Sequence, residues 1–160
     1  VGTFSKSLGS IGGFVSAKSS IAEYIRHKAT AFIFTAALPP ASVAGVIEGL
    51  KILAEDTERR NRLYKNTAYI KRGFFDMGIQ VNNNQVPIVP IQIGDEALTL
   101  YINRLLFDDG IFAGVAVSPV VPPLKAMIRT SFTCAHTRED LDQILSSFKK
   151  NFRQLGMLSK

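Results

Sequence analysis

The chain has 160 residues, of which 46% are hydrophobic and 20% are charged, and its formal net charge is +6. This length is enough for a domain with its own core, and the composition is ordinary for a soluble globular protein. No run of about 18 apolar residues occurs, so we expect no membrane span. The single cysteine, Cys134, excludes an internal disulfide and favours a reducing, cytoplasmic location. The basic residues fall within helical patterns, which favours solvated helix faces over a nucleic-acid surface.

The chain begins at Val1, without a methionine, and enters a stretch rich in glycine and serine at once. An apolar residue and a glycine directly before such a loop are typical of the end of a strand. We therefore expect the chain to be a fragment of a longer protein.

The first third of the chain predicts a strand followed by helices. Residues 12–17 predict a short strand, and a helix is expected from about Ser20, which has the capping-box spacing to Glu23. Pro39 and Pro40 lie where a helix can begin but not continue. The helix that follows them has one apolar face, formed by Val43, Val46, Ile47, Leu50 and Leu53.

From Asp56 on, helical patterns alternate with strand patterns. A helix after Asp56 is expected to stop at Gly78, and the last helix is expected to begin near Thr137. Strands and helices that alternate at this spacing predict an α/β fold rather than a helix bundle. The other predicted elements are strands at 88–93, 111–117 and 126–132 and a helix at 95–109 that ends before Gly110.

Lys6 lies among glycine and hydroxyl residues in "GTFSKSLGSIGG", residues 2–13. A phosphate-binding P-loop would need a glycine where Ser5 stands, and the two histidines and single cysteine are too scattered for a metal site. A lysine amine can form a Schiff base with an aldehyde, while the hydroxyls of Thr3 and Ser5 hold a phosphate. This pattern describes a pyridoxal phosphate site. An ordinary Gly/Ser loop with a solvated lysine is the alternative.

The same segment resembles the cofactor-lysine segment of the α-oxoamine synthases, pyridoxal-phosphate enzymes of aminotransferase class I/II with fold type I. The similarity extends, in the same order, to "FIFTAALPP", "GIFAGVAVSPVVPP" and "MIRTSFTCAHTREDLD". It covers nearly all of this chain but only the C-terminal part, roughly two-fifths, of a family member. The resemblance implies that residues 1–55 form the end of the large cofactor-binding domain and residues 56–160 the small C-terminal α+β domain.

The resemblance implies an acyltransferase that condenses an amino acid with an acyl-CoA, or another acyl thioester, with loss of carbon dioxide. Lys6 matches the lysine that binds the cofactor and moves the α-proton, and Thr3 matches a residue that contacts the cofactor phosphate. Thr35, and with it Ala36, match positions that reach the phosphate of the second subunit in a homodimer. Arg129 matches the arginine that grips the substrate carboxylate, for which its planar fork is suited.

Two other functions stay open. The family's ring-stacking histidine, pyridine-nitrogen aspartate and phosphate loop match no residue here, so a non-catalytic α/β fragment or interaction module is one alternative. A class I/II aminotransferase without the thioester step is the other. We expect capping or packing for His136, a small core position for Cys134, and a turn at Asp108 and Asp109.

Overall fold

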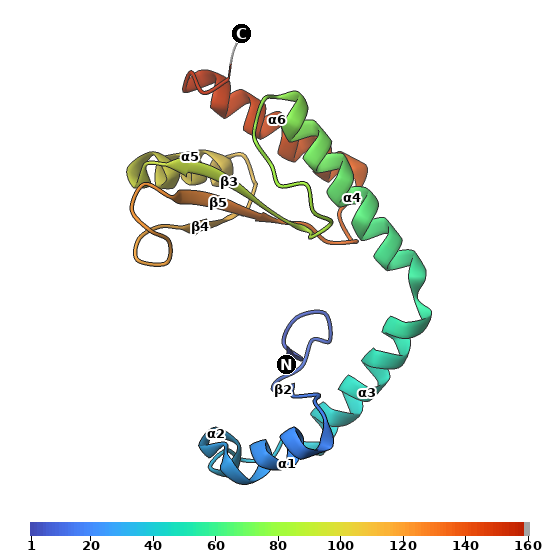
Figure 1. Ribbon diagram of the computed structural model, residues 1–160. Coiled ribbons are helices and arrows are strands. Elements are labelled where there is room, and N and C mark those ends of the chain that lie inside the picture. Colours follow the sequence, from blue (N-terminus) through green and yellow to red (C-terminus); the bar gives the residue numbers. More distant parts are fainter. Residues whose placement is uncertain (159–160) are drawn as a thin grey trace. The chain divides into compact units, whose positions relative to one another are not determined.

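The computed structural model describes residues 1–158 of the chain. The chain forms two compact units, Val1–Thr57 and Glu58–Lys160 (Figure 1). The two units differ in how much apolar surface they bury. Among the described residues of the first unit, Val46 is the one buried hydrophobic side chain, whereas the second unit contains a cluster of fourteen. Burial of apolar surface is the main favourable term in folding, so the second unit has the larger core of its own.

The first unit combines a minimal hairpin with three helices. Its two short strands pair antiparallel, with Gly2 opposite Phe14 and Thr3 opposite Gly13. The third helix begins at Pro40, as the proline pair predicted, because the first turn of a helix does not need the N–H that proline lacks. The elements are β1 (Gly2–Thr3), β2 (Gly13–Phe14), α1 (Ser19–Lys28), α2 (Thr30–Ile33) and α3 (Pro40–Glu55).

Two expectations for the first unit are wrong. The strand predicted at 12–17 shortens to the two residues of β2. Ser20 does not cap a helix, because α1 already begins at Ser19, and Lys18 at its N-cap makes no side-chain capping bond. Within the unit, the apolar face of α3 is covered only around Val46, and its other members are exposed: Val43, Ile47, Leu50 and Leu53.

The second unit packs helices on an antiparallel sheet. Its three strands have the order β3-β5-β4, and β5 in the centre pairs antiparallel with both neighbours. Figure 1 shows α5 lying along the sheet and α6 beside α4. The predicted alternation of helices and strands is thus confirmed. The strands form an antiparallel sheet, as in an α+β domain. The elements are α4 (Thr57–Asp76), β3 (Ile88–Gly94), α5 (Glu96–Asp108), β4 (Gly114–Ala116), β5 (Ala126–Ser131) and α6 (Arg138–Gln154).

The sheet has a helix-covered face and an open face. Along β5, Ala126, Ile128 and Thr130 are buried, whereas Arg129 and Ser131 are exposed, which is the period of two expected for a strand. The edge-on ring pair Phe74–Phe148, with centroids 5.0 Å apart, joins α4 to α6 over the covered face. The core also includes Ile70, Val89, Ile91, Ile102, Leu106, Ile128, Leu141, Ile144 and Phe152.

Most element boundaries in this unit follow the predicted signals. The carboxylate of Asp95 accepts a hydrogen bond from the Leu98 N–H at 2.7 Å and so caps α5 at the predicted start. Gly78 has a φ of 82° and ends the predicted helix after Asp56. The strand predicted at 111–117 is wrong at its beginning, because the Ile111 N–H donates to the Leu106 carbonyl at 2.8 Å and still belongs to the end of α5.

Candidate active site

Lys6 lies in a loop that β1 and β2 close. The Phe4 N–H donates to the Gly12 carbonyl at 2.9 Å, which continues the pairing of the two strands into the loop. The hydroxyl oxygens of Thr3 and Ser5 lie 2.8 Å apart, and the Ser5 N–H donates to the Thr3 hydroxyl at 3.3 Å. The two hydroxyls that the sequence predicts for a phosphate are therefore neighbours on one turn.

The glycines of this loop have a role in the fold itself. A Cβ on Gly2 would lie 2.5 Å from the Phe14 ring, and one on Gly13 would lie 2.4 Å from the Gly2 carbonyl oxygen. Gly12 has a φ of +82°, and a Cβ there would lie 2.4 Å from Leu38. Only glycine allows this close approach and this backbone conformation. The glycine content that suggested a phosphate site is thus required by the hairpin as well.

The side chain of Lys6 is exposed and forms no hydrogen bond or ion pair with residues 1–158. Its carbonyl accepts a hydrogen bond from the Gly9 N–H at 3.0 Å, so the backbone is held while the amine stays available. An amine without a protein partner beside two hydroxyls is the donor set that an aldehyde carrying a phosphate requires. The residues therefore fit pyridoxal phosphate. In the same described part, no group of three or more His, Cys, Asp or Glu could hold a metal ion.

Thr35 and Ala36 directly follow α2, and both are exposed. The Thr35 hydroxyl donates to the Ala31 carbonyl, so it would have to turn away from that carbonyl to donate to a phosphate. The residue before it, Phe34, has 85% of its surface exposed. Thr35 thus lies at the edge of an apolar surface that this unit does not cover.

Arg129 lies on the open face of the sheet, in the central strand rather than at an edge. It is opposite Pro90 of β3 and Gly114 of β4, and neither neighbour has a side chain that can bind a guanidinium. Among the described residues Arg129 has no ion pair or hydrogen bond through its side chain. The planar fork of Arg129 is therefore available to a carboxylate.

Of the predicted site residues, the structure brings Thr3, Ser5 and Lys6 together on one loop. Thr35 belongs to the same unit, and Arg129 belongs to the second unit. No residue of the second unit was predicted to bind the cofactor.

The expectation for His136 is confirmed. Its Nδ1 accepts a hydrogen bond from the Thr133 N–H at 3.0 Å, and its ring packs edge-on against Phe132 with centroids 6.1 Å apart. His136 therefore stabilises the turn before α6. Cys134 is half-buried and is not part of the core cluster, so the core position expected for it is wrong.

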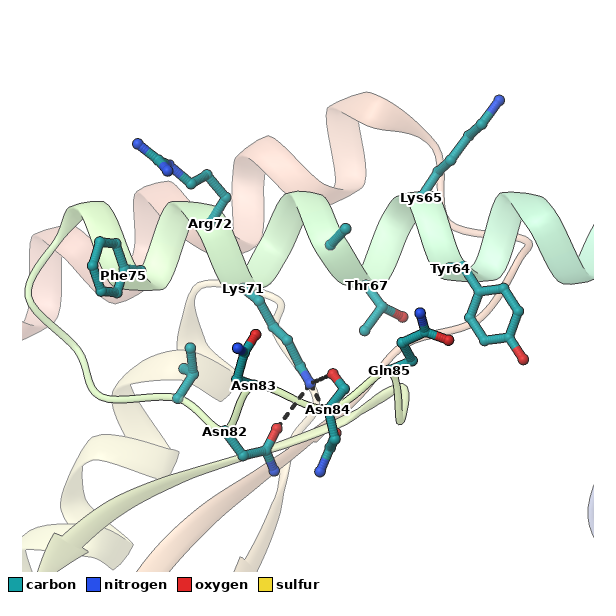
Figure 2. Close-up of a pocket in the computed structure, with 12 residues that line it drawn as sticks. Tyr64, Lys65, Thr67, Lys71, Arg72, Phe75, Asn82, Asn83, Asn84 and Gln85 are labelled. Atoms are coloured by element: carbon teal, nitrogen blue, oxygen red, sulfur yellow. Dashed lines mark hydrogen bonds between the residues drawn. The ribbon is translucent and has the colours of Figure 1, made fainter.

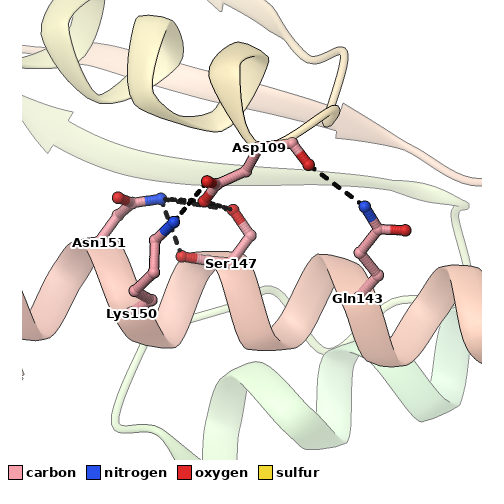
Figure 3. Close-up of polar contacts among 5 residues, drawn as sticks. All are labelled: Asp109, Gln143, Ser147, Lys150 and Asn151. Atoms are coloured by element: carbon pink, nitrogen blue, oxygen red, sulfur yellow. Dashed lines mark hydrogen bonds and ion pairs between the residues drawn. The ribbon is translucent and has the colours of Figure 1, made fainter.

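Asp109 does more than the turn that the sequence predicted (Figure 3). Its carboxylate accepts hydrogen bonds from Ser147 at 2.7 Å and Asn151 at 2.9 Å, and it pairs with Lys150. The bonds from Lys150, then Ser147 and Asn151, lower the pKa of Asp109 to about 2. Asp109 thereby ties the end of α5 to α6. One feature of the sequence could have predicted this cluster: Ser147 and Asn151 are polar residues at buried positions of an otherwise apolar helix face.

A second polar feature lies between α4 and the segment before β3 (Figure 2). It was not predicted from the sequence either. A hollow of about 830 Å³ is lined there by α4 and by residues 81–85. Lys71 donates to the side-chain oxygens of Asn82 at 2.8 Å and Asn84 at 3.0 Å and to the Asn84 carbonyl at 2.5 Å. Burial lowers the pKa of Lys71. Since all three of its protons are engaged, Lys71 anchors this loop and is not available as a nucleophile.

Comparison with known proteins places the fold in a family. The chain matches the family Aminotransferase class I and II over residues 1–148. It is 40% identical to 8-amino-7-oxononanoate synthase of Thermoanaerobacter pseudethanolicus, over 99% of this chain and 40% of that protein. It is 37% identical to serine palmitoyltransferase of Bacteroides thetaiotaomicron, with the same coverage of 99% and 40%. The structure of Sphingomonas wittichii serine palmitoyltransferase superposes with a TM-score of 0.89 at 30% identity, over 99% of this chain and 40% of that one.

The chain therefore belongs to the aminotransferase class I and II family, and its fold is part of fold type I. It spans about 40% of the length of the relatives that it matches. A further serine palmitoyltransferase structure with a TM-score of 0.89 contains pyridoxal phosphate. Pyridoxal phosphate is thus the cofactor of the family to which this chain belongs.

Proposed function

We propose that the full-length protein is a pyridoxal-phosphate-dependent acyltransferase, which condenses an amino acid with an acyl-CoA or another acyl thioester and releases carbon dioxide. One observation carries the proposal: Lys6, whose amine has no partner among the described residues, belongs to the same turn as the neighbouring hydroxyls of Thr3 and Ser5. Over 158 residues, the chain is 40% and 37% identical to enzymes named 8-amino-7-oxononanoate synthase and serine palmitoyltransferase.

Each site residue has a role in this proposal. Lys6 would hold the cofactor covalently and, when its amine is free, would move the proton at Cα of the amino acid. Thr3 and Ser5 would donate hydrogen bonds to the cofactor phosphate. When bound, the cofactor supplies an electron sink for the negative charge that develops at Cα. Arg129 would bind the substrate carboxylate through two parallel hydrogen bonds and so orient Cα.

The proposal extends to the assembly. We assign residues 1–55 to the end of the large cofactor domain and residues 56–160 to the small domain of a cytoplasmic homodimer. Thr35 and Ala36 would reach the cofactor phosphate of the second subunit. The exposed apolar side chains of Phe32, Ile33 and Phe34 support an interface there, because contiguous apolar surface commonly marks protein contacts.

The activity is tested with the full-length protein saturated with pyridoxal phosphate. Amino acids are paired with acyl-CoAs of different chain length, and thiol release is followed with a thiol reagent. We expect thiol release that needs both substrates and that disappears in Lys6→Ala. Lys18→Ala, which changes an exposed lysine of the same unit, is the matched control and should keep the activity.

Covalent labelling tests the assignment of Lys6 independently of turnover. Borohydride reduction of the cofactor-loaded protein, followed by peptide mapping, should place the label on Lys6. Label on any other lysine would contradict the assignment, even if the protein were an active acyltransferase.

A class I/II aminotransferase is the second candidate, because the family model that matches residues 1–148 is that of these enzymes. The two candidates differ in their products. An aminotransferase converts the amino acid to a keto acid with a second keto acid as acceptor and releases no thiol. Keto-acid formation without thiol release would favour this candidate over the acyltransferase.

A further inference from the structure

A basic hollow lies in the second unit, where the first half of α4 meets the beginning of α6. Its volume is about 510 Å³, which is within the range of small-ligand sites. Three cationic side chains line it, and no carboxylate is among the lining residues. These residues are Arg62, Lys65, Asn66, Tyr69, His136, Thr137, Arg138 and Leu141.

Two of the three cations have no acidic partner within residues 1–158. Arg138 forms an ion pair with Asp142 at 3.7 Å, and its guanidinium carbon lies 3.2 Å from the centre of the Tyr69 ring. Arg62 and Lys65, in contrast, have no ion pair with the described residues. They are three positions apart on α4 and therefore share one helix face. The hollow thus keeps about two positive charges for an anion.

One wall of the hollow is held in place by hydrogen bonds. The Asn66 amide donates to the carbonyls of Thr133 at 3.1 Å and His136 at 3.0 Å, which fixes the turn before α6 to α4. Because His136 Nδ1 accepts from the Thr133 N–H, the neutral ring carries its proton on Nε2. Two acids at the beginning of α6 are engaged with residues of the hollow: Asp140 accepts from the Thr137 N–H at 2.8 Å, and Asp142 accepts from the Tyr69 hydroxyl and pairs with Arg138. The turn that lines the hollow together with these cations is thus fixed to α4, and its His136 ring has an N–H donor.

We propose that this hollow is a binding site for a phosphate monoester. A phosphate monoester carries up to two negative charges and three acceptor oxygens, which matches two unpaired cations and neighbouring N–H donors. The volume is sufficient for a phosphate together with part of the group that it esterifies. The phosphate can come from a soluble metabolite or from a lipid headgroup. None of the lining residues is among those assigned to the cofactor or the substrate, and the proposal does not depend on the acyltransferase proposal.

The test uses the full-length protein saturated with pyridoxal phosphate, so that the phosphate site of the cofactor is filled. Isothermal titration calorimetry at low salt measures binding of inorganic phosphate and glycerol 3-phosphate. Sedimentation with vesicles of phosphatidylcholine, with or without phosphatidic acid, measures the headgroup. The double variant Arg62→Gln/Lys65→Gln removes the two unpaired cations. The matched control is Lys149→Gln/Arg153→Gln, which removes the same charge from exposed positions of α6 outside the hollow.

We expect the Arg62/Lys65 variant to bind the phosphate probe about tenfold more weakly or worse, because charge-assisted hydrogen bonds are lost. The Lys149/Arg153 control should bind within about twofold of the original protein, and added salt should weaken binding in both. Binding of the soluble probes assigns a metabolite phosphate, and binding of phosphatidic acid vesicles alone assigns a headgroup. No saturable binding of any probe, or equal losses in both variants, would overturn the proposal. Unchanged circular dichroism shows that the variants are folded.

Discussion

Gly12 illustrates how closely the loop around Lys6 is packed at the level of single residues. It has a φ of +82°, and it lies against Leu38, the residue before the proline pair. Gly45, in the middle of α3, has neither constraint, since a Cβ there would meet nothing within 4 Å. The two glycines therefore differ in what an added methyl group would do.

We predict opposite effects for Gly12→Ala and Gly45→Ala on the free energy of unfolding. Gly12→Ala should destabilise by about 2 kcal/mol or more, because the left-handed backbone costs about 1–3 kcal/mol for other residues and Leu38 must also move. Gly45→Ala should stabilise by about 0.5–1 kcal/mol, the helix preference for alanine over glycine. Urea unfolding curves of the full-length protein measure both. A neutral Gly12→Ala would mean that the loop is not packed in this way.

Arg129 provides a second prediction for a single residue. Arg129→Lys keeps the charge but loses the planar fork, so the KM for the amino acid should rise about tenfold through loss of a charge-assisted hydrogen bond. The KM for the acyl-CoA should change by less than about twofold, since that substrate is not expected to contact Arg129. Steady-state kinetics with each substrate varied separately provides both values. Equal losses for the two substrates would indicate a folding defect, and unchanged kinetics would exclude Arg129 from carboxylate binding.

Among the helices, the start of α6 shows how a cap is built. The Asp140 N–H donates to the Thr137 hydroxyl at 3.2 Å, and the Thr137 N–H donates to the Asp140 carboxylate at 2.8 Å. These reciprocal bonds form a capping box with aspartate in its fourth position. The spacing at Ser20 and Glu23 predicted such a box as well, yet α1 begins one residue earlier.

We therefore predict that Thr137→Ala lowers the free energy of unfolding by about 1 kcal/mol, the usual cost of losing an N-cap. Ser20→Ala is the matched control and should change it by less than about 0.5 kcal/mol, because Ser20 lies inside the first turn and caps nothing. Chemical denaturation of both variants makes the comparison. A loss in Ser20→Ala as large as that in Thr137→Ala would contradict the position of this helix start.

The contact between α5 and α6 predicts that the stability of the fold depends on pH. The pKa of Asp109 falls from 3.8 to about 2 in the folded protein, so the ionised form is the one that the fold stabilises. The contribution of ionised Asp109 to the stability of the fold is complete above about pH 4, and it is lost as the pH falls from about 4 to about 2. Asp109→Asn should lower the midpoint of thermal unfolding by on the order of 5 °C at neutral pH, and this difference should shrink below about pH 4.

Asp108→Asn is the control for this measurement. In the part of the chain that the structure describes, Asp108 pairs only with Arg104, one turn earlier on the same helix, and half of its side chain is exposed. Exposed pairs of this kind contribute little, so the midpoint should hardly change at any pH. Thermal scans of the three proteins between about pH 2 and 7 decide the matter. A constant difference between Asp109→Asn and the original protein across this range would show that the carboxylate charge is not responsible.

For the whole molecule, we predict a homodimer in which Thr35 of each subunit contacts the cofactor of the other. Thr35→Ala should weaken cofactor retention by about 1–3 kcal/mol if a hydrogen bond to the phosphate is lost. Dialysis against buffer without cofactor measures retention, and sedimentation measures the oligomeric state. Thr30→Ala, at the other end of α2, is the control and should retain the cofactor normally. A monomer by sedimentation with full activity would contradict the shared site.

Local chemistry allowed much of the fold to be predicted from the sequence. The helix at 95–109, the start near Thr137 and the strands near 88–93 and 126–132 are confirmed, because caps and period-two burial depend on neighbours along the chain. The strand at 111–117 was wrong because its first residues complete the preceding helix instead of a ladder.

For the candidate site, the residue types could be predicted from the sequence: a lysine between hydroxyls, and an arginine within a strand. The packing of distant segments decided that this arginine lies in the central strand, on the open face between Pro90 and Gly114. It also decided that Asp109 meets Ser147 and Asn151, which are about forty positions away. The physical reason is that strand order and buried polar contacts depend on which distant segments pack together, whereas turns, caps and amphipathic periods are set by residues within a few positions of one another.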